Sequence, residues 1–334
     1  MIPSEKAEAV SRALLSAFGT STIDEIELMT KGLSTALVFK IVVKGSPYLL
    51  RIITKTDALN DPTRQFTCMR AGAEAGIAPE IFYSSIEDRL SITGFVTSAP
   101  FPPDLARKEL PRTLRTLHAL PPFHKPMKNY LDVLDLYISK FSSSGILPAD
   151  ETVECFAGYS RIAEVYPRHE GSGVSCHNDL KPENILFDGK QAWLVDWEAA
   201  FLNDRYVDLS ILANFLVTNE TEEIAFLENY FGEAPTETQR ARFFLMRQAL
   251  HTFYTVMLLL IGSGGKPIAI PASVPDFDDF HRRIWNGEVD LKDDAMKVTY
   301  GWAHRDRLAE NLKSDRLNQA LKIVTGARMN ATAT

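Results

Sequence analysis

The chain has 334 residues, of which 45% are hydrophobic and 24% are charged, an ordinary composition for a folded globular protein. This length predicts two domains or lobes. Its 36 Lys and Arg against 43 Asp and Glu give a formal charge of −7, and no basic cluster stands out. The balance argues against nucleic acid or anionic lipid as a partner, and it is compatible with a cationic small substrate.

Three scattered cysteines, Cys68, Cys155 and Cys176, are too few for a disulfide scaffold or a zinc site. The N-terminus lacks a basic region followed by an apolar run, so we expect no signal peptide. The most apolar stretch, residues 249–262, is shorter than the ~20 residues that span a bilayer and contains His251, which favours a buried helix. These features favour a cytoplasmic protein.

The first hundred residues alternate between strand and turn patterns. We expect a helix over 4–18, strands over 26–28, 36–43 and 48–53, a helix from Asp61-Pro62 to Gly76, and strands over 81–83 and 90–97. This order predicts a mostly antiparallel sheet with one helix inserted after its third strand.

Pro100, Pro102 and Pro103 then form a stiff connector. Helical patterns follow over 104–119, 129–142 and 150–166, then a β-like segment over 174–197, then more helices around a Gly- and Pro-rich loop at 262–279. The predicted fold class is α+β, with a small β-rich lobe over residues 1–98 and a larger, mainly helical lobe over residues 99–334.

The segment 175–210 carries the chemistry. Two apolar runs, 185–187 and 192–195, flank the turn Asp188-Gly189, which predicts a β-hairpin. The hairpin would bring Asp196 back beside Asp179 and Asn184.

Two carboxylates and an amide gathered at one hairpin base supply the oxygen ligands that Mg²⁺ prefers. In phosphoryl transfer by kinases, a loop Asp positions the hydroxyl, an Asn five residues later binds metal, and a downstream Asp binds metal too. Asp179, Asn184 and Asp196 follow this order, with the first two five residues apart. The alternative is that Asp179, Asn184 and Asp196 are turn and cap residues of an ordinary hairpin.

The segments HNDLKPENIL and LVDWEAAFLNDRYVDLS resemble the choline/ethanolamine kinase branch of the aminoglycoside phosphotransferase superfamily, whose fold is protein-kinase-like. The resemblance implies a two-lobed kinase that uses ATP and Mg²⁺. Asp179 would be the catalytic base, and Asn184 and Asp196 would hold the metal. Asp196-Trp197-Glu198 matches the branch, whereas protein kinases have Asp-Phe-Gly at that place.

The same resemblance implies roles for neighbouring residues. His177 would hold the loop by hydrogen bonds, and Lys181 would lie near the transferring phosphoryl group, although a solvated lysine is the alternative. Asp208 resembles the buried aspartate that braces the catalytic loop.

In the β-rich lobe, the loop Lys31-Gly32-Leu33-Ser34-Thr35 resembles the family's phosphate loop, so Gly32, Ser34 and Thr35 would contact phosphate oxygens. Phe95-Val96-Thr97 resembles the linker that hydrogen-bonds adenine, which implies that Phe95 and Val96 bind the nucleotide.

Arg51 would be the cation on the ATP phosphates. The family pairs this cation with a Glu from the following helix, but that position holds Gln65 here. The sequence leaves open whether Gln65 or Glu74 is the partner of Arg51, or whether Arg51 simply faces solvent.

For the acceptor, the family's pair of tryptophans is replaced by His251 and Tyr254, which could instead belong to a core helix. Glu198 offers a carboxylate, and Trp197 lies next to it. Together they imply a small, hydroxyl-bearing and cationic acceptor such as choline or ethanolamine, with an aminoglycoside or another amino alcohol as the alternative.

A protein of a different class, a catalytically silent pseudokinase that only binds, is supported by Lys31 and Gln65 in unexpected places. Beyond residue 262 the resemblance fades, and Trp285 and Trp302 could either pack the core or close the acceptor pocket.

Overall fold

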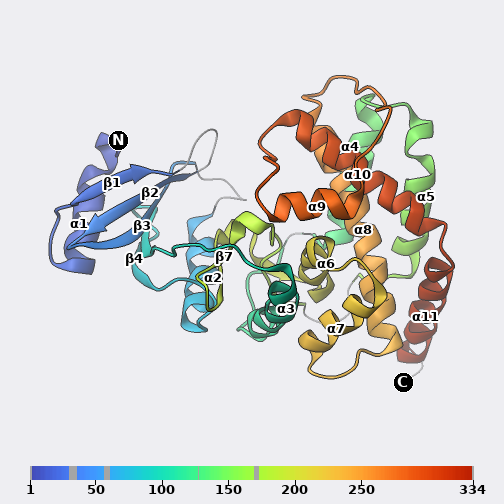
Figure 1. The fold of residues 1–334 in the computed structure, drawn as a ribbon, viewed down its shortest axis with the longest axis horizontal. Coiled ribbons are helices and arrows are strands. Elements are labelled where there is room, and N and C mark those ends of the chain that lie inside the picture. The colour runs from blue at the N-terminus through green and yellow to red at the C-terminus, as the bar shows by residue number, and fades with distance from the viewer. Residues whose placement is uncertain (1, 30–35, 56–60, 127, 169–172, 333–334) are drawn as a thin grey trace.

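The computed structural model describes the whole chain except residues 1, 30–35, 56–60, 127, 169–172 and 333–334. It has a five-stranded antiparallel sheet at the N-terminal end and a mainly helical remainder, arranged as two lobes (Figure 1). The sheet lobe contains α1 Ala7–Phe18, β1 Glu25–Leu28, β2 Ala36–Val43, β3 Ser46–Ile53, α2 Pro62–Glu74, β4 Ile81–Ser85 and β5 Leu90–Gly94.

Among the described residues, the second lobe carries two short antiparallel strand pairs around the segment 175–210 and nine helices. They are α3 Pro103–His118, α4 Tyr130–Ser144, α5 Val153–Val165, β6 Val174–Cys176, β7 Ile185–Phe187, β8 Ala192–Leu194, β9 Phe201–Asn203, α6 Arg205–Leu216, α7 Glu220–Phe231, α8 Glu237–Gly262, α9 Phe277–Trp285, α10 Asp294–Leu312 and α11 Asp315–Thr332. The α+β, kinase-like fold class predicted from the sequence is confirmed.

The sheet has the strand order β1-β2-β3-β5-β4. One of its faces forms a hydrophobic core with α1, and the other lines the cleft between the lobes. Alternate residues of β2, β3 and β5, such as Phe39, Leu50 and Ile92, are buried together with Val10 and Leu14 of α1. Because side chains alternate along a strand, the residues between them point to the opposite face.

On that opposite face, Val38, Arg51 and Ser91 stand at the same level of three adjacent strands and line the cleft between the lobes. The strand periodicity that builds the small core therefore also aims Arg51 at the cleft.

The predicted elements differ from the observed ones mainly at their ends. The fifth strand ends at Gly94 rather than at residue 97, so Phe95 and Val96 belong to an irregular connector. The predicted helix over 150–166 begins at Val153, after a short 3-10 turn over Ala149–Glu151. The lobe boundary predicted at residue 98 falls in the connector between β5 and α3, and it stays a prediction.

The connector is held against the second lobe at three points. The Ala99 N–H donates to the Phe187 carbonyl at 2.6 Å, and the rings of Phe101 and Phe187 stack with centroids 4.3 Å apart. Trp285 of α9 donates its Nε1–H to the Phe101 carbonyl at 2.8 Å. Trp285 thus packs on the connector, whereas Trp302 is buried in the helical core.

Helix α8 runs through the helical lobe and contacts α4, α5, α6, α10 and α11. Among the described residues it is the one helix long and apolar enough to cross a membrane, but two thirds of its most apolar window is buried inside the protein. Its contacts on several sides account for its apolar character, as expected for a core helix.

Helix α2 belongs to the sheet lobe by sequence but packs against the second lobe, and Figure 1 shows it beside β7 between the two. Gly72 of α2 lies against the ring of Trp197, whose exposed fraction is 4%. A Cβ on Gly72 would lie 2.6 Å from Trp197 Cζ2, closer than side-chain carbons approach each other. Only glycine lets the helix approach the ring this closely.

We therefore expect Gly72→Ala to lower the free energy of unfolding by up to about 2 kcal/mol. Overpacking a filled core costs about 1–3 kcal/mol, and the better helix propensity of Ala offsets about 1 kcal/mol of it. The matched control is Gly326→Ala in α11, where an added Cβ meets nothing within 4 Å. That change should raise the free energy by about 0.5–1 kcal/mol. Urea unfolding measures both, and equal effects would contradict the close packing of Gly72.

Candidate active site

The hairpin predicted from the turn Asp188-Gly189 is present as β7 and β8. Asp188 accepts backbone N–H groups of Lys190 and Gln191 at 2.8 and 2.9 Å, which closes the turn. At the base of the hairpin, the Val195 N–H donates to the Asn184 carbonyl at 3.0 Å, so Asp196 returns to the level of Asn184.

Asp179 lies in a compact polar cluster at this base. Its Oδ2 accepts a hydrogen bond from Asn184 Nδ2 at 2.8 Å and lies 3.0 Å from Lys181 Nζ. Asn184 is buried, whereas the side chains of Asp179 and Lys181 are 30% and 45% exposed. The structure brings the predicted base, its neighbouring cation and the predicted metal-binding amide together.

Arg51 joins the two lobes by ion pairs to the second lobe. Its Nη1 lies 2.8 Å from Asp196 Oδ1, and its Nη2 lies 3.4 Å from Glu198 Oε2. Gln65 is buried and lines the same cleft, while Glu74 is exposed. The carboxylates that face Arg51 are therefore Asp196 and Glu198, which neither of the two sequence-based alternatives included.

A cleft of about 450 Å³ lies between the sheet and this cluster. Arg51, Phe95, Val96, Asn184 and Asp196 all line it, as expected for a nucleotide site. The remaining predicted nucleotide-binding residues, Gly32, Ser34 and Thr35, lie outside the described residues.

The residues that would hold Mg²⁺ suit a hard cation. Both hydrogen bonds of Asn184 Nδ2 go to Asp179, to its carbonyl and its Oδ2, each at 2.8 Å. This fixes the amide so that Oδ1 of Asn184 is its remaining ligand atom, and Asp196 adds carboxylate oxygens on the same cleft wall. Amide and carboxylate oxygens are ligands that Mg²⁺ accepts.

One buried carboxylate, that of Asp208, hydrogen-bonds the backbone of the loop that carries Asp179. Asp208 of α6 has no exposed surface, and its two oxygens accept the N–H groups of His177 and Asn178 at 2.8 and 2.7 Å. Asn178 has a φ of 65°, which a non-glycine residue rarely adopts. The hydrogen bonds to Asp208 stabilise this backbone conformation, which presents Asp179 to the cleft.

Two further contacts complete the support of the loop. His177 is buried, and its Nε2 lies 2.9 Å from the Val195 carbonyl, so its predicted holding role agrees with its position. His118 lies 3.2 Å from Asp208 through Nε2 and 2.7 Å from the Tyr230 hydroxyl through Nδ1. His118 and Asp208 are 90 residues apart in the sequence, so no local pattern predicted this link to the loop.

His118, Asp208 and Cys176 also bring three possible metal ligands within 4.8 Å of one another. Asp208 already accepts two backbone hydrogen bonds there, and both nitrogens of His118 have partners. Hydrogen bonding accounts for this buried cluster without a metal ion.

We expect Asp208→Asn to lower kcat by about 10²-fold, because small misplacements of a reacting group cost about this much. The new NH₂ group would face a backbone N–H, which leaves a buried donor without an acceptor and costs about 1–3 kcal/mol of stability. Asp188→Asn is the control, since it also accepts two backbone amides but is exposed. Steady-state kinetics and urea unfolding check both variants, and an unchanged kcat in folded Asp208→Asn protein would refute the bracing role.

Two residues expected at the acceptor site are buried. Trp197 packs against Gly72 and donates its Nε1–H to the Leu194 carbonyl at 3.3 Å. His251 has no exposed surface, and its Nδ1 lies 2.9 Å from Nδ1 of His304. Both positions favour packing roles, and acceptor binding by either residue stays a prediction. A helical spacing alone could not distinguish the buried side of α8 from its open side.

Tyr254 and Glu198 occupy more open positions. Burial raises the pKa of the Tyr254 hydroxyl, and the negative charges of Asp179 and Asp208 raise it further. Glu198 is turned toward Arg51, and its pKa is raised by burial and by the neighbouring charge of Asp196. Of the predicted acceptor residues, Tyr254 is thus partly exposed, while Glu198 faces the sheet lobe.

The three histidines around Tyr254 should make the fold sensitive to acid. Burial lowers the pKa of His281 to about 3 and holds the pKa values of His251 and His304 well below the usual 6.5. Below pH 6.5 these histidines bind protons in the unfolded chain but stay neutral in the folded chain. The free energy of unfolding that they contribute above that pH is therefore lost as the pH falls toward 3.

Each such histidine should add about 1.4 kcal/mol per pH unit to the slope of the unfolding free energy. His281→Gln, which cannot take up the proton, should flatten the slope between pH 6 and 4 by about this amount. The exposed His124→Gln serves as the control. Urea unfolding at several pH values measures the slopes, and identical slopes in wild type and His281→Gln would contradict the buried neutral histidine.

A sheet lobe and a helical lobe that meet at a cleft, with a His-x-Asp loop, an Asn and an Asp gathered there, define a kinase-like phosphotransferase. The comparison with family models agrees. The chain belongs to the phosphotransferase enzyme family, APH, whose model matches residues 25–244.

Solved structures show the same fold at low sequence identity. A choline/ethanolamine kinase family protein from Mesorhizobium loti is 20% identical, with a TM-score of 0.66 over 96% of this chain and 99% of that one. Choline kinase LicA from Streptococcus pneumoniae is 15% identical, with a TM-score of 0.57 over 92% and 99% of the two chains. The streptomycin–ATP–APH(2")-IIa ternary complex is 14% identical, with a TM-score of 0.55 over 78% and 91%.

Among curated proteins, an uncharacterized protein from Metamycoplasma hominis is 27% identical over 145 residues. The match spans 40% of this chain and about a quarter of that relative's length.

Proposed function

We propose that this phosphotransferase transfers the γ-phosphoryl group of ATP to the hydroxyl of a small, amine-bearing molecule of the choline or ethanolamine type. The observation that carries the proposal is the joint placement of Asp179, Asn184 and Asp196 at one cleft, opposite Arg51. An aminoglycoside or another amino alcohol is the alternative acceptor.

In this mechanism, Asp179 accepts the proton of the acceptor hydroxyl as its oxygen forms a bond to the γ-phosphorus. The bond between that phosphorus and the bridging oxygen of ADP breaks, and ADP leaves. Mg²⁺, bound by Asn184 and Asp196, would neutralise charge on the phosphate oxygens.

Lys181 and Arg51 flank the same space and would offset the charge that develops during transfer. Lys181 Nζ lies 3.0 Å from Asp179 Oδ2, and the negative charge of Asp179 opposes the effect of burial and raises the Lys181 pKa. The ammonium group is therefore retained beside the base.

Three features support a cationic acceptor. Tyr254 offers a partly exposed aromatic ring, and rings of this kind attract ammonium groups by about 0.5–1 kcal/mol at exposed sites. Glu198 offers a carboxylate two residues after Asp196, although it pairs with Arg51 here. The formal charge of −7 favours the approach of a cation.

The cytoplasm is the proposed location. The three cysteines are buried free thiols, which suits a reducing compartment.

Asp196→Ala and Asp179→Asn should separate metal binding from base catalysis. In Asp196→Ala, Mg²⁺-dependent nucleotide affinity should be lost. In Asp179→Asn, nucleotide affinity should persist while turnover falls by about 10²–10⁴-fold, the usual contribution of a positioned base. Titrations of nucleotide with and without Mg²⁺, together with kcat, test this. Near-normal turnover in Asp179→Asn would contradict its assignment, and a fully silent wild type that still binds ATP would favour the pseudokinase alternative.

The acceptor is tested by kcat/KM for choline, ethanolamine and an aminoglycoside in wild type, Tyr254→Ala and Glu198→Gln. If Tyr254 binds the ammonium group, Tyr254→Ala should lower kcat/KM for amine-bearing acceptors severalfold more than it changes ATP hydrolysis without acceptor. Glu198→Gln should affect the primary amine of ethanolamine more than choline, because only the former can donate a hydrogen bond to the carboxylate. His251→Gln is a control in the core. If the ratios of kcat/KM between these acceptors change by less than about twofold, well under the ~1.4 kcal/mol of a tenfold change, neither residue belongs to the acceptor site.

A further inference from the structure

A second cavity, of about 790 Å³, lies in the helical lobe. Its described lining residues come from the start of α4 and the segment before it, the segment after α5, strands β6 and β9, the start of α6, the end of α7, and α8. None of them lines the nucleotide cleft. The volume falls within the range of small-molecule sites, about 300–1,000 Å³. This cavity has no part in the proposed phosphoryl transfer.

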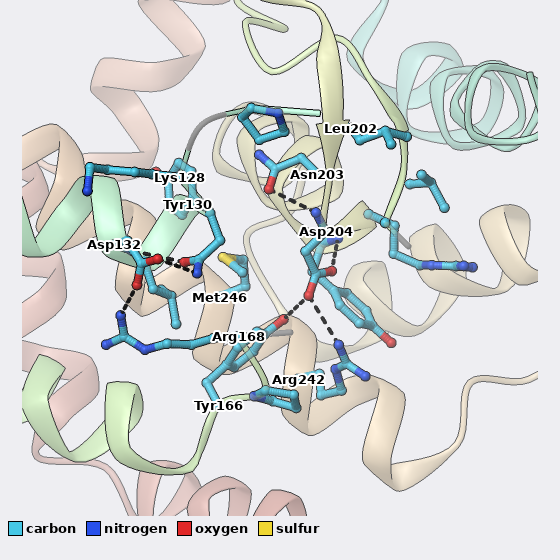
Figure 2. A pocket seen from close by; sticks show the side chains of 18 of the residues that line it. Lys128, Tyr130, Asp132, Tyr166, Arg168, Leu202, Asn203, Asp204, Arg242 and Met246 are labelled. Carbon is cyan, nitrogen blue, oxygen red and sulfur yellow. Dashed lines mark hydrogen bonds and ion pairs between the residues drawn. The ribbon is translucent and has the colours of Figure 1, made fainter. Parts of the chain in front are cut away.

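Its acidic side chains are already neutralised. Figure 2 shows Asp132 paired with Arg168, at 2.6 Å, and Asp204 contacted by both Arg242 and Tyr166, at 3.1 and 3.0 Å. These ion pairs fix the walls of the cavity and leave little negative charge to attract a cation.

Three further cations line the cavity: Lys125, Lys128 and Arg205. Within the described part of the chain, none of the three has an ion-pair partner. The lining therefore carries five cationic side chains and two acidic ones, on a protein whose formal charge is −7. A cationic excess in a concave site of an acidic protein concentrates anions locally.

The N-termini of two helices add to the positive electrostatic potential of the cavity. Asn129 caps α4 and Asp204 caps α6, and both residues line the cavity with the first turns of their helices. A helix N-terminus carries about half a positive charge. The nonpolar part of the lining includes Leu202, Met246 and the ring of Tyr130, so the occupant needs a nonpolar body as well as a charge.

The cavity adjoins the support of the catalytic loop. Asn203, at its wall, donates from Nδ2 to Asn178 Oδ1 at 2.7 Å, and Asp204 caps the helix that carries Asp208. An occupant would contact the elements that hold Asp179 without contacting Asp179 itself.

We propose that this cavity is a second binding site, for a small organic anion that joins a phosphate or carboxylate group to a nonpolar body. The anion lies toward the unpaired cations Lys125, Lys128 and Arg205, and the body lies against Leu202, Met246 and Tyr130.

The test is isothermal titration calorimetry on the full chain saturated with Mg²⁺ and ADP, which fills the nucleotide cleft. Phenyl phosphate and phenylacetate are the probes, since they share a ring and differ in the anion. Benzyl alcohol is the neutral control. We expect at least one anion to bind with a Kd below about 1 mM, and to bind about tenfold more weakly in about 0.5 M NaCl, because salt screens exposed charges.

The variant Lys125→Glu with Lys128→Glu should weaken binding of that anion at least about tenfold. The matched control changes the exposed Lys190 and Lys322 to Glu, far from the cavity lining. Both double variants lower the formal charge by four, from −7 to −11. They therefore differ only in whether the positive charges are removed at the cavity or elsewhere.

Any of three results would overturn the proposal. Neither anion binds below about 1 mM, benzyl alcohol binds as tightly as the anions, or the two double variants weaken binding equally. The last result would assign the effect to the overall charge rather than to this cavity. The proposed phosphoryl transfer could fail without changing these titrations, and it could hold even if both anions fail to bind.

Discussion

The buried carboxylate of Asp208 is the interaction on which the active site depends. It is fully enclosed, and a charge in that position is tolerable only because two backbone N–H groups and His118 surround it. In return it fixes the left-handed backbone of Asn178, and the residue after Asn178 is the proposed base. Hydrogen bonds to a charged group are worth about 1.5–3 kcal/mol, enough to stabilise one unfavourable backbone conformation of about 1–3 kcal/mol.

The two lobes meet through unlike contacts, one nonpolar and one ionic. Gly72 of α2 lies against the buried ring of Trp197, which anchors the inserted helix to the second lobe. Arg51 of β3 pairs with Asp196 and Glu198 across the open cleft. The nonpolar contact is buried and shape-specific, whereas the ion pairs are partly exposed and therefore weaker. Nucleotide phosphates and Mg²⁺ would compete with the ionic contact and leave the nonpolar one intact.

Helices α9 and α10, which lie beyond the residues matched by the family model, pack against residues near the site. Trp285 of α9 binds the connector that leads out of the nucleotide cleft. His304 of α10 stacks on Tyr254 with ring centroids 4.8 Å apart, and His304 in turn pairs with His251. The C-terminal helices thus position both the connector on the nucleotide side and the ring of Tyr254.

The sequence by itself determined the sheet, the hairpin and the cluster of Asp179, Asn184 and Asp196. These features depend on short-range patterns: the two-residue period of strands, the turn Asp188-Gly189, and fixed spacings within one loop. The hairpin needs only a few residues to bring its two ends together. The cluster of Asp179, Asn184 and Asp196 at its base could therefore be predicted without knowledge of any tertiary contact.

Only the tertiary structure decided which side chains are enclosed and which charges meet. Arg51 and Glu198 are 147 residues apart in sequence, and His118 and Asp208 are 90 apart, so no local pattern links them. The three-residue spacing of His251 and Tyr254 fits both a core helix and a helix that binds the acceptor. The neighbouring helices bury His251 and leave Tyr254 partly open, because burial depends on what packs against a helix and not on the periodicity of the helix itself.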